Sequence, residues 1–480
     1  MKQILIVLTV LMQLSLAQCQ PSGRKIEIEI KGISDTVLYL VHYYGNSNSI
    51  ADTAFRDKSG KYTFAGKTSL AQGVYIVVDE TKSKPYFEFL VDKNQHFKMK
   101  TDTVAAFDNL EITNSPVNEL FKAYSNYVRD SRKEADAIRE KINALKEEDA
   151  EKNHAAIKDL ELQFREVDKR VKAYQRELAD KDPGSMLAVL LNLQWEPEGP
   201  NLENATRQDS LNAYYYTKSH YWDKINFADD RYVRTPIFHE KLKTFMTVLV
   251  VQHPDSVIME GEKIIAQTVP APELYKFVVW YMGNMTERSN VMGMEKAFVH
   301  FAREYYLKGK TWWASEPVLK KMDERVRVLE RTLIGVVAPE LQMWDTNKVV
   351  TSLQRVKSDF TILVFWDYDC GHCAKVMPVL RDYYHEVKKE GVEVFAVCTK
   401  TDLDKWKKAI QDKQLDWINV NGGYSINRYD TLYDIMATPV IFLLDREKKI
   451  LAKKIEVEQL KEILKIEMDR RNQEADKPRN

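Results

Sequence analysis

Residues 24–112 carry short runs in which apolar and polar side chains alternate. Ile26, Ile28 and Ile30, for example, are separated by charged residues, and turns that contain glycine divide this run from later ones. Because successive side chains of a strand point to opposite faces, such alternation predicts strands with one buried face. We therefore predict a small antiparallel β domain of sandwich type over residues 24–112.

Residues 116–333 change to a helical pattern, which opens with a highly charged stretch over residues 118–180. Apolar residues recur there at alternating intervals of three and four, at Ile157, Leu160, Phe164, Val167, Val171, Tyr174 and Leu178. This spacing places them on one stripe of a helix that needs a partner. An earlier stripe lies slightly out of phase, so an antiparallel hairpin that bends near residues 147–153 fits as well as one long helix.

From residue 335 to 474, apolar runs of strand length alternate with helical patterns. We predict an added strand or hairpin at 341–345, strands at 362–366, 392–398, 417–420, 440–444 and 450–455, and helices at 373–390, 402–413, 428–434 and 457–470. Strands that alternate with helices indicate an α/β domain. The fold class is thus multidomain, with an N-terminal antiparallel β domain, an α-helical middle region and a C-terminal α/β domain.

Two cysteines, in Cys370-Gly-His-Cys373, lie at the junction between the predicted strand 362–366 and the helix that follows it. The partial positive charge of a helix N-terminus favours the thiolate, so we expect Cys370 to be the nucleophile. Cys373, one turn later, is placed to attack a mixed disulfide and release the reduced partner. We expect His372 to lower the pKa of Cys370 and Asp369 to raise it.

Cys-x-x-Cys is also half of a zinc site. No second such pair and no His-x-x-x-His motif follows, and the chain has only four cysteines. We therefore favour redox chemistry and predict no metal and no cofactor apart from a redox-active Cys370–Cys373 disulfide, while a metal site and a structural disulfide remain as alternatives. Cys398 lies in a predicted core strand, where we expect an inert thiol.

The N-terminus reads as a secretory signal peptide over residues 1–17, with one lysine, an apolar run and a Ser15-Leu16-Ala17 cleavage site. Leu16 to Cys19 also partly resembles a lipoprotein processing site, from which Gln18 departs. We favour simple cleavage near Ala17 and keep lipid attachment at Cys19 as an alternative. An exported chain works where disulfide chemistry is common, which suits the cysteine pair.

Composition and charge give no indication of a nucleic-acid-binding or membrane-spanning protein. The 480 residues are 44% hydrophobic, enough for several cores, and contain 71 basic and 71 acidic side chains. A balanced charge gives no indication of nucleic-acid binding. No apolar run approaches the roughly 18 residues of a membrane helix, so we predict no transmembrane span.

The C-terminal part resembles the thioredoxin superfamily, in particular the exported TlpA/ResA-like thiol-disulfide oxidoreductases. The resemblance rests on Ala338-Pro339 at the start of the domain, Trp366, Cys370, Cys373, Pro378 and Thr438-Pro439. It implies a thioredoxin fold, a cis peptide bond before Pro439, and a role for Trp366, Thr438 and Pro439 in positioning a substrate peptide. Asp369 stands where the family commonly has tryptophan, and Val364 stands where many thioredoxins have a buried carboxylate.

We therefore expect an exported thiol-disulfide oxidoreductase of the periplasm or envelope of a Gram-negative bacterium. Its partners would be protein thiols and disulfides and an unidentified redox donor or acceptor. The direction, reduction or isomerisation, remains open. A peroxidase fits less well, because Asp367 stands where a threonine is needed. From another class, the chain could be an envelope scaffold that uses the thioredoxin fold as a docking module.

Overall fold

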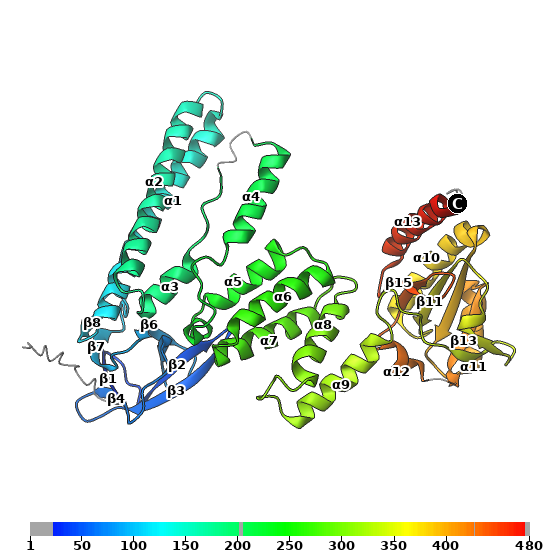
Figure 1. Ribbon diagram of the computed structural model, residues 1–480, viewed down its shortest axis with the longest axis horizontal. Coiled ribbons are helices and arrows are strands. Elements are labelled where there is room, and N and C mark those ends of the chain that lie inside the picture. The colour runs from blue at the N-terminus through cyan, green and yellow to red at the C-terminus, as the bar shows by residue number, and fades with distance from the viewer. Residues whose placement is uncertain (1–22, 201–204, 427, 476–480) are drawn as a thin grey trace, which may run out of the picture. The chain divides into compact units, whose positions relative to one another are not determined.

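The computed structural model describes residues 23–200, 205–426 and 428–475 (Figure 1). The chain forms two compact units that divide between Phe245 and Met246. The predicted signal peptide, residues 1–17, and Cys19 lie outside the described residues. Among the residues described, no helix combines the length and the apolar character needed to cross a membrane.

The first unit begins with two four-stranded sheets, in the orders β4-β1-β7-β8 and β3-β2-β5-β6. The strands are β1 (Arg24–Lys31), β2 (Val37–Tyr44), β3 (Ser47–Phe55), β4 (Lys61–Gly66), β5 (Gly73–Val78), β6 (Pro85–Val91), β7 (His96–Asp102) and β8 (Glu111–Thr113). Ile26 and Phe64 of one sheet share a buried core with Leu40 and Phe89 of the other. The two sheets therefore form a sandwich.

One pairing in the sandwich departs from the prediction of an antiparallel domain. β1 pairs with β7 in parallel, whereas the other neighbours in both sheets are antiparallel. Alternation identifies the buried face of a strand, but it does not say which distant strand will lie beside it or in which direction.

Two long helices follow, α1 (Pro116–Asp149) and α2 (His154–Lys181). The chain reverses between them, and the helices lie side by side (Figure 1). Ile138 and Ile142 of α1 pack on Ile157 and Val167 of α2. The remaining surface of this hairpin is charged and exposed, with cross-helix ion pairs such as Arg170 to Glu134 at 2.7 Å.

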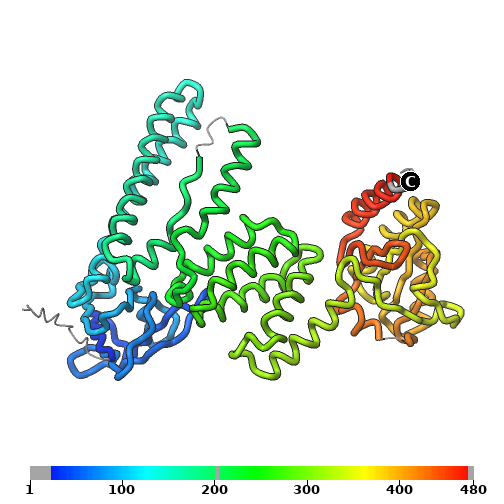
Figure 2. Tube along the Cα trace, viewed as in Figure 1, coloured from blue at the N-terminus to red at the C-terminus, as the bar shows by residue number. Residues whose placement is uncertain are grey.

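Shorter helices complete the first unit: α3 (Met186–Gln194), α4 (Arg207–His220), the 3₁₀ turn η1 (Asp230–Arg234) and α5 (Phe238–Thr244). α3 is apolar on nearly every side and seven of its residues are buried. α4 begins with a capping box, in which Thr206 and Asp209 exchange hydrogen bonds between side chain and backbone. Figure 2 follows the chain through this region.

The second unit opens with a helical bundle, α6 (Pro254–Thr268), α7 (Pro272–Glu287), α8 (Glu295–Phe301) and α9 (Glu316–Glu330), with the π-helical segments η2 (Phe245–Leu249) and η3 (Ala302–Leu307). Proline lies in the first turn of α6, α7 and α9. A proline is tolerated there because its missing N–H would have no partner within the helix. Phe298 of α8 packs on Val326 and Leu329 of α9.

The chain then builds a seven-stranded sheet, here called the C-terminal sheet, in the order β10-β9-β13-β12-β11-β14-β15. Its strands are β9 (Gln342–Asp345), β10 (Val350–Ser352), β11 (Phe360–Trp366), β12 (Val392–Cys398), β13 (Ile418–Ser425), β14 (Val440–Leu444) and β15 (Ile450–Lys453). Its helices are α10 (Gly371–Val387), α11 (Leu403–Lys413), α12 (Tyr429–Tyr433) and α13 (Val457–Ala475), with the 3₁₀ turns η4 (Leu353–Arg355) and η5 (Lys388–Glu390).

Strand β11 lies inside this sheet, parallel to β12 and antiparallel to β14. Ile362 and Val364 point into the core shared with α10 and α13, while Leu363 and Phe365 point into the core beneath α12. A strand buried on both faces reads as a continuous apolar run, which is what residues 362–366 show. The element order is that of a thioredoxin fold, and the predicted multidomain fold class is confirmed.

A buried ion pair joins the bundle to the C-terminal sheet. Lys453 of β15 has a side chain only 1% exposed, and its Nζ lies 3.3 Å from a carboxylate oxygen of Glu295 at the start of α8. Burial lowers the pKa of Lys453, and the charge of Glu295 opposes that effect. The buried lysine thus has a partly buried carboxylate as its counter-charge.

Candidate active site

The two cysteines lie at the carboxyl end of β11. The strand ends at Trp366, and α10 begins at Gly371 with Cys370 as its N-cap residue. The first turn of a helix has backbone N–H groups without partners in the helix, and these groups point toward the N-cap. The sulfur of Cys370 therefore lies where hydrogen-bond donors converge.

Cys370 is partly exposed, and its thiol donates a hydrogen bond to the backbone oxygen of Thr438 at 3.4 Å. Its pKa is lowered, chiefly because the backbone N–H of Cys373 hydrogen-bonds to the sulfur. The Cys373 thiol, the backbone N–H of His372 and the Thr438 side chain also lower it, whereas burial raises it. These contacts favour the thiolate, the form that acts as a nucleophile.

Cys373 has the opposite environment. It is fully buried in the core beneath α10, and its sulfur accepts a hydrogen bond from the backbone N–H of Asp367 at 3.4 Å. Burial raises the pKa of Cys373 to about 11, against hydrogen bonds from Asp367 and Thr438 that lower it. The pair therefore combines an accessible thiol that ionises readily with a hidden thiol that stays protonated.

The other predicted site residues fall into two groups. His372 and Asp369 are exposed, and the contribution of His372 to the lowered pKa of Cys370 comes from its backbone N–H. The backbone N–H of Asp369 donates to the Asp367 carboxylate at 2.8 Å. Thr438 and Pro439 lie beside the sulfurs, and the bond between them is cis, as the resemblance implied.

Trp366 requires a correction. It was predicted to help position a substrate, but its side chain has no exposed surface and packs in the same core as Cys373. A fully buried side chain cannot touch a substrate, so any effect of Trp366 on the site acts through packing around Cys373. The family resemblance identified the position but not the burial of the ring.

Sequence reasoning missed two charged residues near the cysteine pair, Asp367 and Lys400. Asp367 directly follows β11, and its largely buried carboxylate lies 3.3 Å from Nζ of Lys400. The same residue supplies the N–H that contacts Cys373. The available signal was position, since Asp367 and Lys400 both follow the carboxyl ends of adjacent parallel strands, where side chains meet.

Cys398, the third described cysteine, ends β12 and is fully buried. Burial raises its pKa to about 12, which agrees with the expectation of an inert thiol. All three described cysteines are free thiols. Within residues 23–200, 205–426 and 428–475, no cluster of three His, Cys, Asp or Glu side chains is arranged to hold a metal ion.

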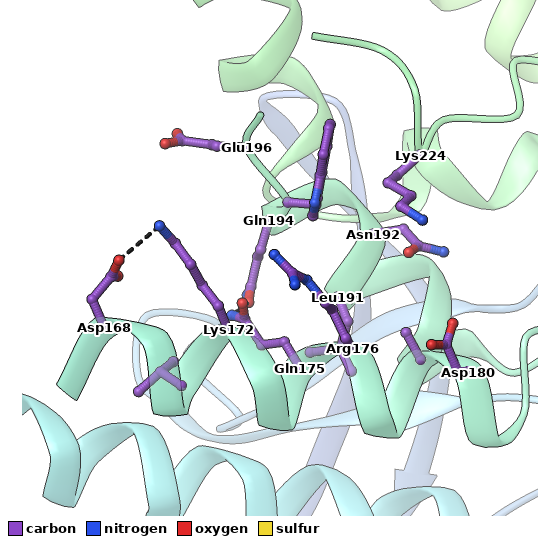
Figure 3. Close-up of a pocket in the computed structure, with 13 residues that line it drawn as sticks. Asp168, Lys172, Gln175, Arg176, Asp180, Leu191, Asn192, Gln194, Glu196 and Lys224 are labelled. Carbon is purple, nitrogen blue, oxygen red and sulfur yellow. Dashed lines mark hydrogen bonds and ion pairs between the residues drawn. The ribbon is translucent and has the colours of Figure 1, made fainter. Parts of the chain in front are cut away.

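The first unit has a cavity of about 270 Å³ between α2, α3 and the segment that follows α3 (Figure 3). Its charged lining consists of three cations and three acids, Lys172, Arg176, Lys224, Asp168, Asp180 and Glu196. Lys172 pairs with Asp168 at 2.7 Å, as Figure 3 shows. The lining contains no thiol and its charges balance, so this cavity does not resemble the site at Cys370.

Comparison with known proteins also indicates thiol-disulfide chemistry. Residues 358–450 match a family model described as thioredoxin-like. A thiol-disulfide oxidoreductase named ResA from Bacillus thuringiensis subsp. konkukian is 30% identical over 140 residues, which are 28% of this chain and 76% of that protein. The chain belongs to the ResA-like thiol-disulfide oxidoreductases. Another ResA, from Bacillus subtilis, is 28% identical over 125 residues, 24% of this oxidoreductase and 64% of the relative.

Solved structures are similar as well. A domain of a possible thiol-disulfide isomerase from Cytophaga hutchinsonii is 35% identical and covers 29% of this oxidoreductase and 96% of that chain, with a TM-score of 0.28. A thioredoxin-like protein from Bacteroides caccae is 20% identical and covers 57% and 98%, with a TM-score of 0.45.

The ResA similarity leaves most of the oxidoreductase outside it. Residues 25–121 and 197–330 match two family models described as domains of unknown function, DUF4369 and DUF5106. The first lies mainly over the sandwich and the second over helices α4 to α9. The scaffold alternative is not favoured, because the ResA relatives are named as thiol-disulfide oxidoreductases.

Proposed function

We propose that this oxidoreductase is exported to the periplasm or cell envelope and exchanges disulfides with protein substrates through Cys370 and Cys373. The observation that carries the proposal is the asymmetry of the two thiols. Cys370 is partly exposed and has a lowered pKa, whereas Cys373 is buried and has a pKa raised to about 11. A nucleophile and a protected resolving thiol require this difference.

The reaction starts from the reduced pair. The Cys370 thiolate attacks one sulfur of a substrate disulfide, forms a mixed disulfide and displaces the other substrate sulfur as a thiolate. Cys373 then loses its proton and attacks the sulfur of Cys370, which closes the Cys370–Cys373 disulfide and releases the second substrate thiolate. The substrate gains two electrons from the enzyme. The Cys373 proton and the proton that Cys370 released to water on ionising together account for the two protons that convert the substrate thiolates to thiols. In the reverse direction the same steps oxidise a dithiol.

Cys370 and Cys373 can complete this cycle by themselves, so the proposal needs no metal and no cofactor. Thr438 and Pro439 border Cys370, and we assign them the binding of the substrate backbone. Asp367, whose backbone N–H contacts Cys373, is suitably placed to stabilise that sulfur as it ionises. The signal peptide predicted over residues 1–17 supports export.

The test uses two active-site variants and one control. Cys370→Ser should reduce insulin disulfide exchange to the uncatalysed rate, because no nucleophile remains. Cys373→Ser should accumulate mixed disulfides with envelope proteins, since nothing resolves them. Cys398→Ala, which removes the buried third thiol, should keep wild-type exchange. Full activity of both active-site variants would refute the proposal.

A further inference from the structure

A cavity of about 320 Å³ in the second unit, here called the groove, adjoins residues 434–439, here called the active-site loop, which connect α12 to β14. Five parts of the chain line it, namely α9, α10, residues 434–439 ahead of β14, the start of β14, and the turn between β15 and α13. The lining residues are Arg325, Val376, Asp434, Met436, Ala437, Pro439, Val440, Ile441, Lys454, Ile455 and Glu456. Only Arg325 comes from the bundle, outside the thioredoxin fold.

Arg325 holds the loop from the bundle side. Its Nη1 lies 2.5 Å from Oδ1 of Asp434, a carboxylate only 7% exposed. Nζ of Lys454 contacts the other oxygen of the same carboxylate at 3.0 Å. Asp434 caps the end of α12, which packs against α9 (Figure 1). The segment from Asp434 to Pro439 is therefore fixed at its start by a helix that the thioredoxin fold does not contain.

The groove is continuous with the site of chemistry. Pro439 lines it, and the backbone oxygen of the neighbouring Thr438 accepts the hydrogen bond from Cys370. A polypeptide whose sulfur is bonded to Cys370 and whose backbone runs beside Thr438 would lie next to Pro439. One direction of that path leads into the groove.

The lining favours an apolar side chain. Its charged residues are two cations and two acids, and the Asp434 carboxylate is shared by Arg325 and Lys454. The remaining lining residues are apolar, and Met436 is 89% exposed at the rim. Exposed, flexible methionine is typical of surfaces that accept varied apolar groups. With no net charge to offer, the groove would gain little from a charged residue of the substrate.

We propose that α9 and the active-site loop together form a subsite that binds an apolar side chain of a polypeptide substrate next to its disulfide. Arg325 lines this subsite and holds the loop in place through its ion pair with Asp434. This inference rests on the proposed function. It gives the helical bundle a part in substrate selection, which the thioredoxin fold alone would not provide.

The first test compares two substrates with pre-reduced enzyme. Arg325→Ala should lower the second-order rate constant for insulin, relative to that for 2-hydroxyethyl disulfide, by about fivefold to tenfold, because only the polypeptide reaches the groove. Arg325→Lys, which keeps a charge facing Asp434, should recover part of this ratio. The matched control is Arg327→Ala, since Arg327 is exposed on the same helix and pairs with Asp323; its ratio should equal that of the wild type.

The second test replaces an exposed residue at the rim of the groove, where a substitution should not disturb folding. Met436→Asp places a charge at a side chain that is already exposed and should lower the insulin rate in the same ratio. An unchanged ratio in both Arg325→Ala and Met436→Asp would overturn the subsite and leave the proposed function intact. Absence of exchange with either substrate in the wild type would instead refute the proposed function.

Discussion

The N-terminal sandwich and the C-terminal sheet are built from similar apolar strands, but they differ in what lies at the strand ends. In the sandwich, both sheets turn their apolar faces to one shared core, and residues 24–113 contain no cysteine. In the C-terminal sheet, helices cover both faces. The parallel strands β11 and β12 end at Trp366 and Cys398, and short segments lead from there to Cys370 and Lys400.

This difference shows how arrangement, rather than apolar content, creates a reactive site. Parallel strands need a long crossover connection, and where that connection is a helix its N-terminus lies beside the strand ends. In this oxidoreductase the helix is α10, and its amides lower the pKa of Cys370. In the sandwich, by contrast, the long helix α1 follows β8, and no cysteine lies at its N-terminus. Reactivity and stability should therefore respond to different residues in the two units.

The largest expected effect is the difference in alkylation between thiols. At pH 7, iodoacetamide should modify Cys370 at least about a hundred times faster than Cys373, because the pKa of Cys370 lies below 9.0 and a pKa of about 11 leaves about one Cys373 in ten thousand ionised. Burial should slow Cys373 further, and Cys398, with a pKa of about 12, should stay unmodified. Peptide mass mapping of the reduced wild-type protein measures all three.

The pH dependence has a definite sign. Raising the pH converts Cys370 to its thiolate, so its alkylation rate should increase and then level off, with a midpoint below the ordinary thiol value of 9.0. A midpoint above that value, or equal rates for Cys370 and Cys373, would contradict the asymmetry.

The next effect is on stability. Phe89 is fully buried in the sandwich, with ring centroids 5.9 to 6.3 Å from those of Phe97, Phe87 and Tyr75. Phe89→Ala should destabilise the first unit by about 3–5 kcal/mol, the usual cost of removing a buried ring. Calorimetry should show one unfolding transition at a lower temperature, while the alkylation rate of Cys370 at 25 °C stays the same.

A matched substitution in the second unit completes this experiment. Phe365 of β11 is equally buried, 5.2 Å from the ring of Tyr433. Phe365→Ala should lower the other transition and disturb the strand that carries the cysteine pair. If Phe89→Ala slowed exchange as much as Phe365→Ala, the separation between a structural sandwich and a chemical sheet would be lost.

The smallest effect concerns the α1–α2 hairpin. Arg170 and Glu134 pair at 2.7 Å with side chains about half exposed. Solvent and salt screen such pairs, so Arg170→Ala should change the free energy of unfolding by at most about 1 kcal/mol. Ile142→Ala, in the buried stripe, provides the contrast in the same urea titration, with an expected loss of about 2–5 kcal/mol.

Much of the fold follows from local pattern. β12 and β14 have the predicted bounds. Most other elements of the C-terminal domain begin or end within a few residues of their own predicted bounds. These elements are bounded by turns and differ in period, which a single sequence displays. Local pattern could not reveal the parallel partner of β1, because the choice of partner depends on contacts between distant segments.

The cysteine pair was predictable for the same reason, since its chemistry depends on a local strand-to-helix junction. The burial of Trp366 was not, because it depends on helices that fold over the strand. Nor was the contact between Arg325 and Asp434, residues 109 positions apart, each of which looks like an ordinary surface charge in the sequence. The local sequence pattern therefore predicts which residues react better than it predicts which distant side chains surround them.

The buried pair of Lys453 and Glu295 has a consequence for how this protein can be divided and can evolve. Mutation of Glu295 alone would leave an ammonium group enclosed without its counter-charge, which is strongly destabilising, whereas joint replacement of both by apolar residues can be tolerated. The two positions should therefore change together among related sequences. A fragment cut at Gly335 would present Lys453 to water, so it would be a poor stand-in for the intact second unit.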